Sequence, residues 1–334
     1  MNIYTAIQNL ANYKKYLQVE EFTHTYLKKK GYLKTDLPVL SPALIPESYL
    51  EVFETELRHN KIYHKLYLTP SPELFLKRLL AYGAGNCYCL GKAFRNADPS
   101  GGLHMPEFTM LEFYKTKANY MDIASEVLSL LRFIADNMTG GEQISYQGKR
   151  VTFSRWEKIS VIQAFFKYAG ITEKELFNHR LFLKIASKKG YKTHGFTYQD
   201  LFSQIYVQEI EPHLGKGGYP TLIYDYPKEF AALAKLNTDG RTAQRFEFYI
   251  EGVELGDCYT ELTDANEQKK RFIHEQKLRK QLKKKTHPVD KGLVQALEYG
   301  LTDCAGIAIG FERMAMIFAD VTSIAELKLI HINI

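Results

Sequence analysis

Apolar side chains recur at helical spacing in several stretches of the chain. Between residues 14 and 30 they fall at Tyr16, Leu17, Val19, Phe22, Tyr26 and Leu27. This spacing predicts a helix over Lys14–Lys30 that ends at Gly31, where a left-handed cap is favoured. Amphipathic patterns likewise predict helices over Pro72–Tyr82 and Tyr120–Asn137.

Other stretches have the composition of strands. The runs NCYCLGKAFRN and FTMLEFYKT are joined by the turn-rich segment DPSGGLHMP, which predicts a hairpin with a long loop. The segment RFEFYIEGVELGDCYTEL predicts two further strands, and YLKTDLPVLSP predicts a short strand ended by Pro42. A polar helix is expected from about Asp264 to Lys285, and DCAGIAIGFERMAMIFAD predicts a strand running into a helix.

No linker or internal repeat divides the chain, so we expect one domain over residues 1–334. The interval from about 140 to 240 alternates helical stretches with loops and carries no chemical motif, which favours a helical elaboration inside that domain. Hydrophobic residues make up 45% and charged residues 25% of the 334 positions, which excludes disordered and fibrous classes. No apolar run is long enough for a membrane span, and the N-terminus lacks the pattern of a signal peptide, so we expect a cytoplasmic protein.

Charge and cysteine content narrow the chemistry further. The four cysteines, Cys87, Cys89, Cys258 and Cys304, form no CxxC pair, so we interpret them as reduced and structural. The net charge of +6 is too small to indicate strong nucleic-acid binding. Nine of the seventeen residues from 269 to 285 are nonetheless Lys or Arg. This stretch is either a solvated helix face or a surface that steers an acidic partner.

Five sequence segments carry chemistry, and together they point to a family. They are Pro38, TPSPE at 69 to 73, FRN at 94 to 96 with HMPEFTMLEFY ending at 114, GVELGDCYTEL at 252 to 262, and GIAIGFER at 306 to 313. In this order and spacing they resemble the catalytic core of class II aminoacyl-tRNA synthetases, most closely the lysyl branch. The resemblance implies an α+β fold, an antiparallel sheet flanked by helices, and a homodimer made by the region from Lys14 to Pro42.

The resemblance also implies an ATP site. Activation of a carboxylate by in-line attack on the α-phosphate needs fixed cations near the phosphates. Arg95 and Arg313 match the family's catalytic arginines at the α- and γ-phosphates, and the aromatic face of Phe108 suits an adenine. Glu254 and Glu261 match positions that could hold Mg²⁺ through carboxylate oxygens. The full set of implied ATP-binding positions is Arg95, Asn96, Ala97, Met105, Phe108, Glu254, Leu255, Gly310 and Arg313.

A second group of residues predicts the amino-acid substrate. Glu73, Glu112 and Glu261 would repel one another in an apolar site unless the ligand were a cation. We therefore expect an amino acid with a second amine. By resemblance to the lysyl branch, the binding positions are Ser71, Pro72, Glu73, Glu112, Tyr114 and Glu261.

The N-terminal region distinguishes between branches of the family. The first-motif helix begins within the first twenty residues, which leaves no room for the anticodon-binding barrel that precedes the core in lysyl-tRNA synthetases. The chain therefore resembles the short paralogues that attach β-lysine to a lysine of elongation factor P, and Ala308, where lysyl-tRNA synthetases have Gly, agrees. This makes tRNA an unexpected partner. The alternatives are a truncated lysyl-synthetase-like enzyme acting on tRNA or another acceptor, and a non-catalytic paralogue that binds lysine and ATP.

Some positions depart from the family pattern. Ala97 lacks the carboxylate that would hold the adenine amine, and Asp98 could replace it only if the loop shifts. The family has Arg or Tyr, His and Asn where this chain has Leu103, His104 and Met105, so a further polar contact with ATP is lost. Asp257 stands where Asn is usual, and could add a negative charge to the pocket.

Overall fold

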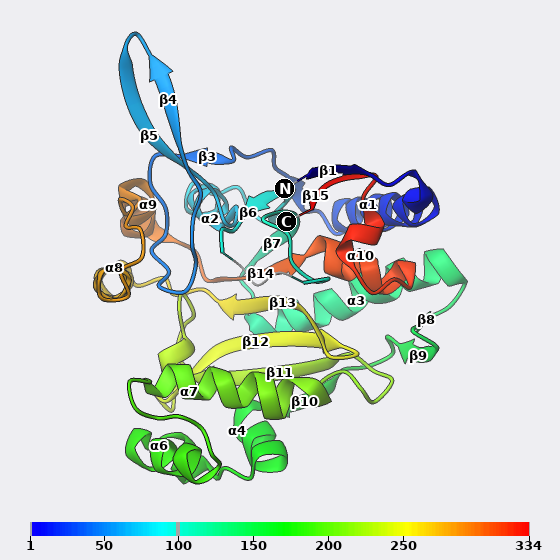
Figure 1. Cartoon of the computed structure of the whole chain (residues 1–334). Helices are drawn as coiled ribbons and strands as arrows, with labels where there is room; N and C mark the ends of the chain where they lie inside the picture. The colour runs from blue at the N-terminus through cyan, green and yellow to red at the C-terminus, as the bar shows by residue number, and fades with distance from the viewer. Residues whose placement is uncertain (1, 98–100, 334) are drawn as a thin grey trace.

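The fold is organised around a sheet of eight strands. The computed structural model describes residues 2–97 and 101–333, and the sheet has the order β10-β11-β12-β13-β14-β7-β6-β2. All pairs from β11 to β6 are antiparallel, and the two outermost pairs are parallel. The expected α+β fold with an antiparallel sheet is therefore confirmed (Figure 1). The strands of this sheet are β2 (Leu33–Lys34), β6 (Cys87–Phe94), β7 (Glu107–Thr116), β10 (Glu157–Ser160), β11 (Thr221–Pro227), β12 (Thr242–Ile250), β13 (Val253–Thr260) and β14 (Cys304–Gly310).

Three smaller sheets complete the strands. One pairs the two chain ends, and the strand that would run to Pro42 is instead two short pieces in different sheets. The hairpin of β4 and β5 projects from the body (Figure 1). The sequence pattern did not indicate it, because its side chains are mostly exposed and do not alternate between apolar and polar. The remaining strands are β1 (Asn2–Thr5), β3 (Leu40–Ser41), β4 (Glu54–His59), β5 (Ile62–Leu68), β8 (Gln143–Tyr146), β9 (Lys149–Thr152) and β15 (Ile330–Asn333).

Helices cover both faces of the large sheet. One face packs on α1 (Leu10–Lys29), α3 (Tyr120–Thr139) and α10 (Phe311–Ala319), which form the main core with it. The other face is covered at one end by α2, α8 and α9 and at the other end by α4 to α7 (Figure 1). Those elements are α2 (Glu73–Ala81), α4 (Val161–Ala164), α5 (Glu173–Leu176), α6 (His179–Lys188), α7 (Tyr198–Ile205), α8 (Ala265–Gln281) and α9 (Lys291–Gly300).

Local signals explain where the long helices begin and end. Asn119 and Asp122 form a capping box at the start of α3, and Gly140 ends the helix in the left-handed conformation. Gly31, with φ +79°, follows the last turn of α1 as its sequence predicts. The polar helix α8 ends earlier than expected because the chain turns back after Gln281, and the buried Arg279 donates to the carbonyl of Lys285.

The interval from 140 to 240 carries strands as well as helices. It supplies β8 to β11, and β10 and β11 extend the main sheet, so the interval is joined to the core by backbone pairing. The four cysteines are buried free thiols. Among the described residues, no helix combines the length and the hydropathy needed to cross a bilayer.

Candidate active site

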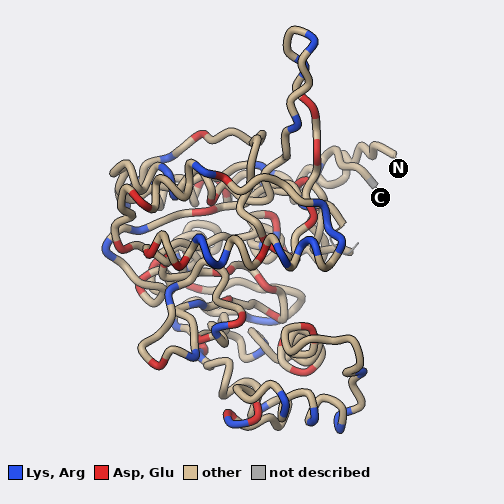
Figure 2. The backbone as a smooth tube through the Cα atoms, turned by 90° about the vertical axis from the view of Figure 1, so that its left-hand side faces the viewer, with Lys and Arg blue, Asp and Glu red and all other residues tan. Residues whose placement is uncertain are grey.

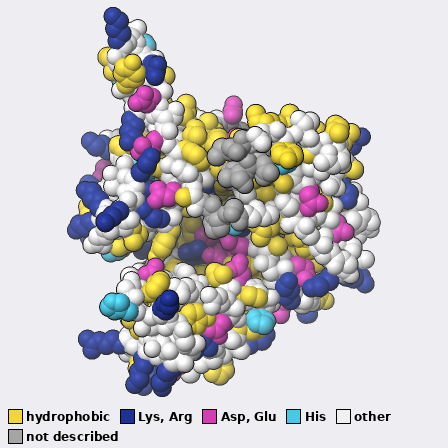
Figure 3. Space-filling view, in the orientation of Figure 1, with side chains coloured by type: hydrophobic (Ala, Val, Ile, Leu, Met, Phe, Trp, Pro, Cys, Tyr) yellow, Lys and Arg dark blue, Asp and Glu magenta, His cyan; other side chains and the backbone are white. Residues whose placement is uncertain are grey.

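The site lies on the sheet face between the two groups of covering helices. Paired residues of neighbouring strands share a face, so the register places side chains in rows across the sheet. One row runs from β6 to β12 and consists of Cys89, Glu112, Ala308, Asp257 and Glu247. Three of its five members are acidic. Figure 3 shows a hollow in the middle of this side of the molecule, where acidic side chains gather.

The next row explains why Gly306 stands in β14. Tyr114 of β7 pairs with Gly306, and a Cβ on Gly306 would lie 2.2 Å from the Tyr114 ring. Gly306 therefore leaves the space that the aromatic ring fills. The Tyr114 hydroxyl in turn donates to Glu112 at 2.7 Å. Gly310 ends the strand and is the N-cap residue of α10, the helix that carries Arg313.

The start of α2 brings the predicted amino-acid-binding residues together. The Ser71 hydroxyl donates to Glu112 at 2.7 Å and accepts from the backbone N–H of Glu73 at 3.0 Å. Pro72 is the N-cap residue of the helix. The carboxylate of Glu261, which directly follows β13, reaches the same place and is 1% exposed. Ser71, Glu73, Glu112, Tyr114 and Glu261 thus form one buried cluster.

The cluster also contains a cation that the sequence reading missed. The Lys77 ammonium lies 2.5 Å from Glu73 Oε1 and 2.6 Å from Glu261 Oε2, and Lys77 is 4% exposed. Burial lowers the pKa of Lys77, but Glu261 and Glu73 outweigh it and hold that pKa above its usual value. The four-residue spacing from Glu73 to Lys77 is the available sequence signal, although such pairs commonly lie on solvated helix faces.

The remaining acids of the cluster hold protons unusually tightly. Burial, reinforced by Glu73, raises the pKa of Glu112 to about 8. Burial also raises the pKa of Glu261 to about 7, against the opposing effect of Lys77. Ionising these acids together is therefore unfavourable, and a cationic ligand would make it favourable.

A fourth acid reaches the cluster from the segment that connects β3 to β4. Burial and the neighbouring Glu73 raise the pKa of Glu47 to about 7. The segment is held from behind, because Arg279 donates to the carbonyls of Glu47 and Leu50, and the backbone N–H of Ser48 donates to Glu275 at 2.8 Å. No local motif in the sequence marks Glu47, since its position depends on these contacts with α8.

The two predicted phosphate-binding arginines differ in their surroundings. Arg95 follows β6, its guanidinium carbon lies 5.4 Å from the centroid of the Phe108 ring, and its buried Nε has no hydrogen-bond partner among the described residues. Arg313 is tied into the protein. It donates to the carbonyls of Leu103 at 3.1 Å and Glu254 at 2.9 Å, and its Nη2 lies 2.8 Å from His104 Nε2.

Glu254 and Glu261 are not brought together. They lie at opposite ends of β13, roughly 20 Å apart at about 3.3 Å per residue. The β12–β13 register shift pairs Tyr249 with Glu254 and Phe248 with Gly256, so Leu255 is the extra residue of a β-bulge.

Glu254 has other acidic neighbours. Burial, followed by the charge of Glu247 across the hairpin, raises the pKa of Glu254. The sequence pattern did not identify Glu247 as a neighbour of Glu254. The two residues belong to the same sequence segment, with Glu247 on β12 and Glu254 on β13. The described residues hold no group of three or more metal-ligating side chains. Glu247 is itself engaged, because Arg245 donates to one of its carboxylate oxygens and the Tyr249 hydroxyl donates to the other. Glu254 is therefore the better candidate of the two for a Mg²⁺ ion that arrives with the phosphates.

Asp257, the departure from Asn, is paired inside the protein. It accepts from Arg245 Nε at 3.0 Å and from the Tyr259 hydroxyl at 3.0 Å. Arg245 also binds Glu247 at 2.9 Å. Burial raises the pKa of Asp257 to about 7, which Arg245 opposes. Arg245 pairs with both acids, so its single positive charge offsets only part of the negative charge that Asp257 adds.

Of the other predicted ATP-binding positions, Asn96 and Ala97 directly follow Arg95 in the chain. The N–H of Asn96 donates to the carbonyl of Glu51 at 3.0 Å, and Ala97 has φ +60°, in the left-handed region. Met105 packs on the main core, and Leu255 is buried in it, so a nucleotide contact at Leu255 would come from the backbone. Asp98 lies outside the described residues.

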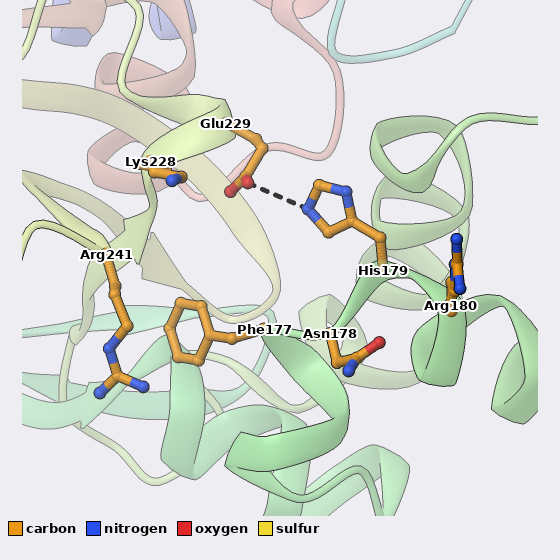
Figure 4. A pocket seen from close by; sticks show the side chains of 7 residues that line it. All are labelled: Phe177, Asn178, His179, Arg180, Lys228, Glu229 and Arg241. Carbon is orange, nitrogen blue, oxygen red and sulfur yellow. Dashed lines mark hydrogen bonds and ion pairs between the residues drawn. The ribbon is translucent and has the colours of Figure 1, made fainter.

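A separate open pocket of about 520 Å³ lies in the helical interval and shares no residue with this cluster (Figure 4). His179 contacts Glu229 at 3.0 Å there, and the Arg241 guanidinium lies over the Phe177 ring at 4.8 Å.

Comparison with known proteins identifies the family. A family model described as "tRNA synthetases class II (D, K and N)" matches residues 6–330. The chain belongs to this family. The class II match therefore spans both the acidic cluster and the arginines.

Individual relatives align over nearly the whole chain. An "Elongation factor P--(R)-beta-lysine ligase" of Proteus mirabilis (strain HI4320) is 33% identical over 324 residues, covering 95% of this chain and 94% of the relative. Proteins with the same name from Yersinia enterocolitica and from Buchnera aphidicola (strain APS) are 33% and 34% identical, covering 92% and 90% of this chain and 91% and 89% of the relatives. The alignments thus cover about nine tenths of each of those relatives.

Proposed function

We propose that this chain is an ATP-dependent, AMP-forming ligase that activates (R)-β-lysine, or lysine, and transfers it to the ε-amine of a lysine of elongation factor P. The observation that carries the proposal is the buried cluster of Glu73, Glu112 and Glu261. The names of the near-full-length relatives support the same reaction.

The cluster suits a substrate with two amino groups. Carboxylates in a buried site are costly unless cations pair with them, and Glu261 Oε1 has neither a hydrogen bond nor an ion pair among the described residues. The substrate's ammonium groups would supply the missing partners. Ala308 lies between Glu112 and Asp257 in the row across the sheet, so its methyl group forms part of the floor and affects which amine position fits.

The arginines suit the first chemical step. The substrate carboxylate attacks the α-phosphorus of ATP, an aminoacyl-adenylate forms, and pyrophosphate leaves. Arg95 would bind the α-phosphate, and Arg313 the γ-phosphate, while Phe108 stacks on the adenine. A Mg²⁺ ion carried by the phosphates would be held by Glu254 and would screen the charge of the leaving pyrophosphate.

In the second step the amine of the acceptor lysine, as the free base, attacks the adenylate carbonyl. An amide bond forms, and AMP leaves together with a proton. Because these substrates belong to translation, we propose that the enzyme acts in the cytoplasm.

The basic stretch after residue 268 is the proposed approach surface for the acidic acceptor. Figure 2 looks onto the side of the molecule that carries α8, where basic positions follow one another along the chain. Lys284 and Lys285 are partly engaged, because Lys284 donates to the Tyr49 carbonyl at 2.9 Å and Lys285 lies 3.4 Å from Glu54. Lys277, Lys280 and Lys283 are exposed and have no partner among the described residues, so they are among the lysines available for steering.

A second copy of this chain is the other proposed partner. Apolar side chains are exposed along α1 and the paired chain ends, including Ile3 at 76% and Ile7 at 67%. A groove of about 520 Å³ beside them is lined by residues of α1, β6 and the segment before β15. A homodimer through this region would cover both features.

The proposal is tested by ATP–pyrophosphate exchange with a panel of amino acids. We expect exchange with β-lysine or lysine and none with norleucine, which has the same chain length as lysine and no second amine. Exchange with norleucine but not with either diamine would contradict the proposal. Absence of exchange with every amino acid would favour the non-catalytic alternative.

A further inference from the structure

The pocket contains its own lysine, and this residue has no role in the proposed reaction so far. Lys77 comes from the second turn of α2 and is 4% exposed, so its charge cannot be screened by solvent. It contacts one carboxylate from its own helix, Glu73, and one from the end of β13, Glu261. These two acids come from segments far apart in the sequence, and Lys77 is the group that joins them.

We infer that Lys77 is a positioning residue that holds Glu73 and Glu261 as ionised acceptors for the substrate's ammonium groups and thereby sets the preference of the pocket for a doubly cationic amino acid. This inference rests on the proposed function.

The charges of the cluster support this role. Without Lys77, the carboxylates of Glu47, Glu73, Glu112 and Glu261 would face one another in a buried site, and buried carboxylates in that situation take up protons instead of ionising. With Lys77 ionised, one negative charge of the Glu73–Glu261 pair is balanced. The other remains for one ammonium group of the ligand, and Glu112, whose pKa is raised, can release its proton when a second ammonium group binds.

The geometry supports it as well. Glu73 and Glu261 meet Lys77 through one oxygen each, Oε1 and Oε2 respectively, so Lys77 fixes the orientation of both carboxylates. The other oxygen of Glu261 is buried and unpaired among the described residues, which leaves it to accept from a ligand. Lys77 also acts on Glu112, whose pKa it lowers against the larger effect of burial.

The test compares Lys77→Met with a matched substitution on the other face of the sheet. Lys115 lies on β7 next to Tyr114, so its side chain points to the opposite face, where it binds the buried Glu126 at 3.0 Å. Lys115→Met therefore removes an ion pair to a buried glutamate without changing the pocket. The Michaelis constant for lysine in ATP–pyrophosphate exchange is measured from about pH 6 to 9 for both variants.

For Lys77→Met we expect the Michaelis constant to rise at least about tenfold at pH 7 and to recover toward alkaline pH, because a shift of one pKa unit corresponds to a tenfold change. In the Lys115→Met variant, the pH at which the Michaelis constant is half-way through its change should equal that of the wild type. The inference is overturned if this pH is also unchanged in Lys77→Met, or if both variants shift it equally.

A measurement without substrate separates this inference from the proposed function. Thermal melts of the ligand-free protein should show that Lys77→Met loses more stability as pH rises, because the unbalanced carboxylates of Glu47, Glu73, Glu112 and Glu261 then ionise together. Adding Glu73→Gln to that variant should restore part of the loss at high pH. A loss that does not depend on pH, or no recovery in the double variant, would overturn the role of Lys77 even if the wild type activated no diamine.

Discussion

Arg95 and Arg313 are expected to be equally necessary for adenylate formation and unequally important for stability. Arg313 makes three hydrogen bonds of 2.8–3.1 Å to Leu103, Glu254 and His104, and its side chain is 20% exposed. Arg95 makes a ring contact with Phe108 at 5.4 Å and leaves its Nε unpaired. Replacing each by Ala therefore removes very different sets of protein contacts.

The magnitudes follow from these contacts. Hydrogen bonds to a charged group contribute about 1.5–3 kcal/mol each when fully buried, and partial access of water reduces the total for Arg313→Ala to about 2–3 kcal/mol. Loss of one cation–π contact costs about 0.5–1 kcal/mol for Arg95→Ala. With an unfolding entropy of about 0.7 kcal/mol/K for a chain of this length, the melting temperatures fall by about 3–4 °C and about 1 °C respectively.

The assay pairs calorimetric melting of the ligand-free variants with ATP–pyrophosphate exchange. Both variants should lose at least about a hundredfold in exchange rate, since each removes a fixed cation from the phosphates. Arg313→Lys is the control that separates charge from geometry, because it keeps the positive charge at this position and loses the forked hydrogen-bonding geometry of the guanidinium. Equal melting temperatures for the two Ala variants, or a larger drop for Arg95→Ala, would refute the reasoning.

Three further predictions concern pH, the acceptor and the subunit contact. Because the pKa of Glu112 is raised to about 8, the folded state keeps a proton that the unfolded state releases. Stability should therefore fall as pH rises from about 5 to 8. In Glu112→Gln the melting temperature should depend less on pH over this range. Reversing Lys277, Lys280 and Lys283 to Glu should slow transfer to elongation factor P at low salt while leaving adenylate formation unchanged, and equal transfer rates would reduce the stretch to a solvated face. Sedimentation at micromolar concentration should give a dimer, which Leu17→Glu should dissociate; a monomeric wild type would contradict the proposed interface.

The sequence predicted the parts of the fold that local patterns determine. The β6–β7 hairpin, the helix α3 and the β14–α10 junction have the expected positions, because strand alternation, a capping box and a strand-to-helix turn are all encoded by neighbouring residues. The motif residues could be placed for the same reason, since each motif belongs to one such element.

What could not be predicted depends on contacts between distant segments. The sequence alone indicates that Lys77 is an ordinary lysine on a helix surface. Its role depends on the contact with Glu261, which the fold of β13 creates. The partner of Glu254 could not be recognised because the bulge at Leu255 changes the register of the hairpin. The position of Glu47 depends on a buried Arg279 more than two hundred residues away, which hydrophobic periodicity does not reveal.

The central claim, transfer of an activated diamino acid to a protein, is tested most directly by offering both acceptors at once. Purified enzyme, ATP and labelled (R)-β-lysine are incubated with elongation factor P and lysine tRNA together, and each acceptor is then separated and analysed by mass spectrometry. We predict label on a single lysine side chain of elongation factor P, joined by an amide bond, and none on the tRNA. Label on the 3′ end of the tRNA with an unmodified elongation factor P would contradict the account.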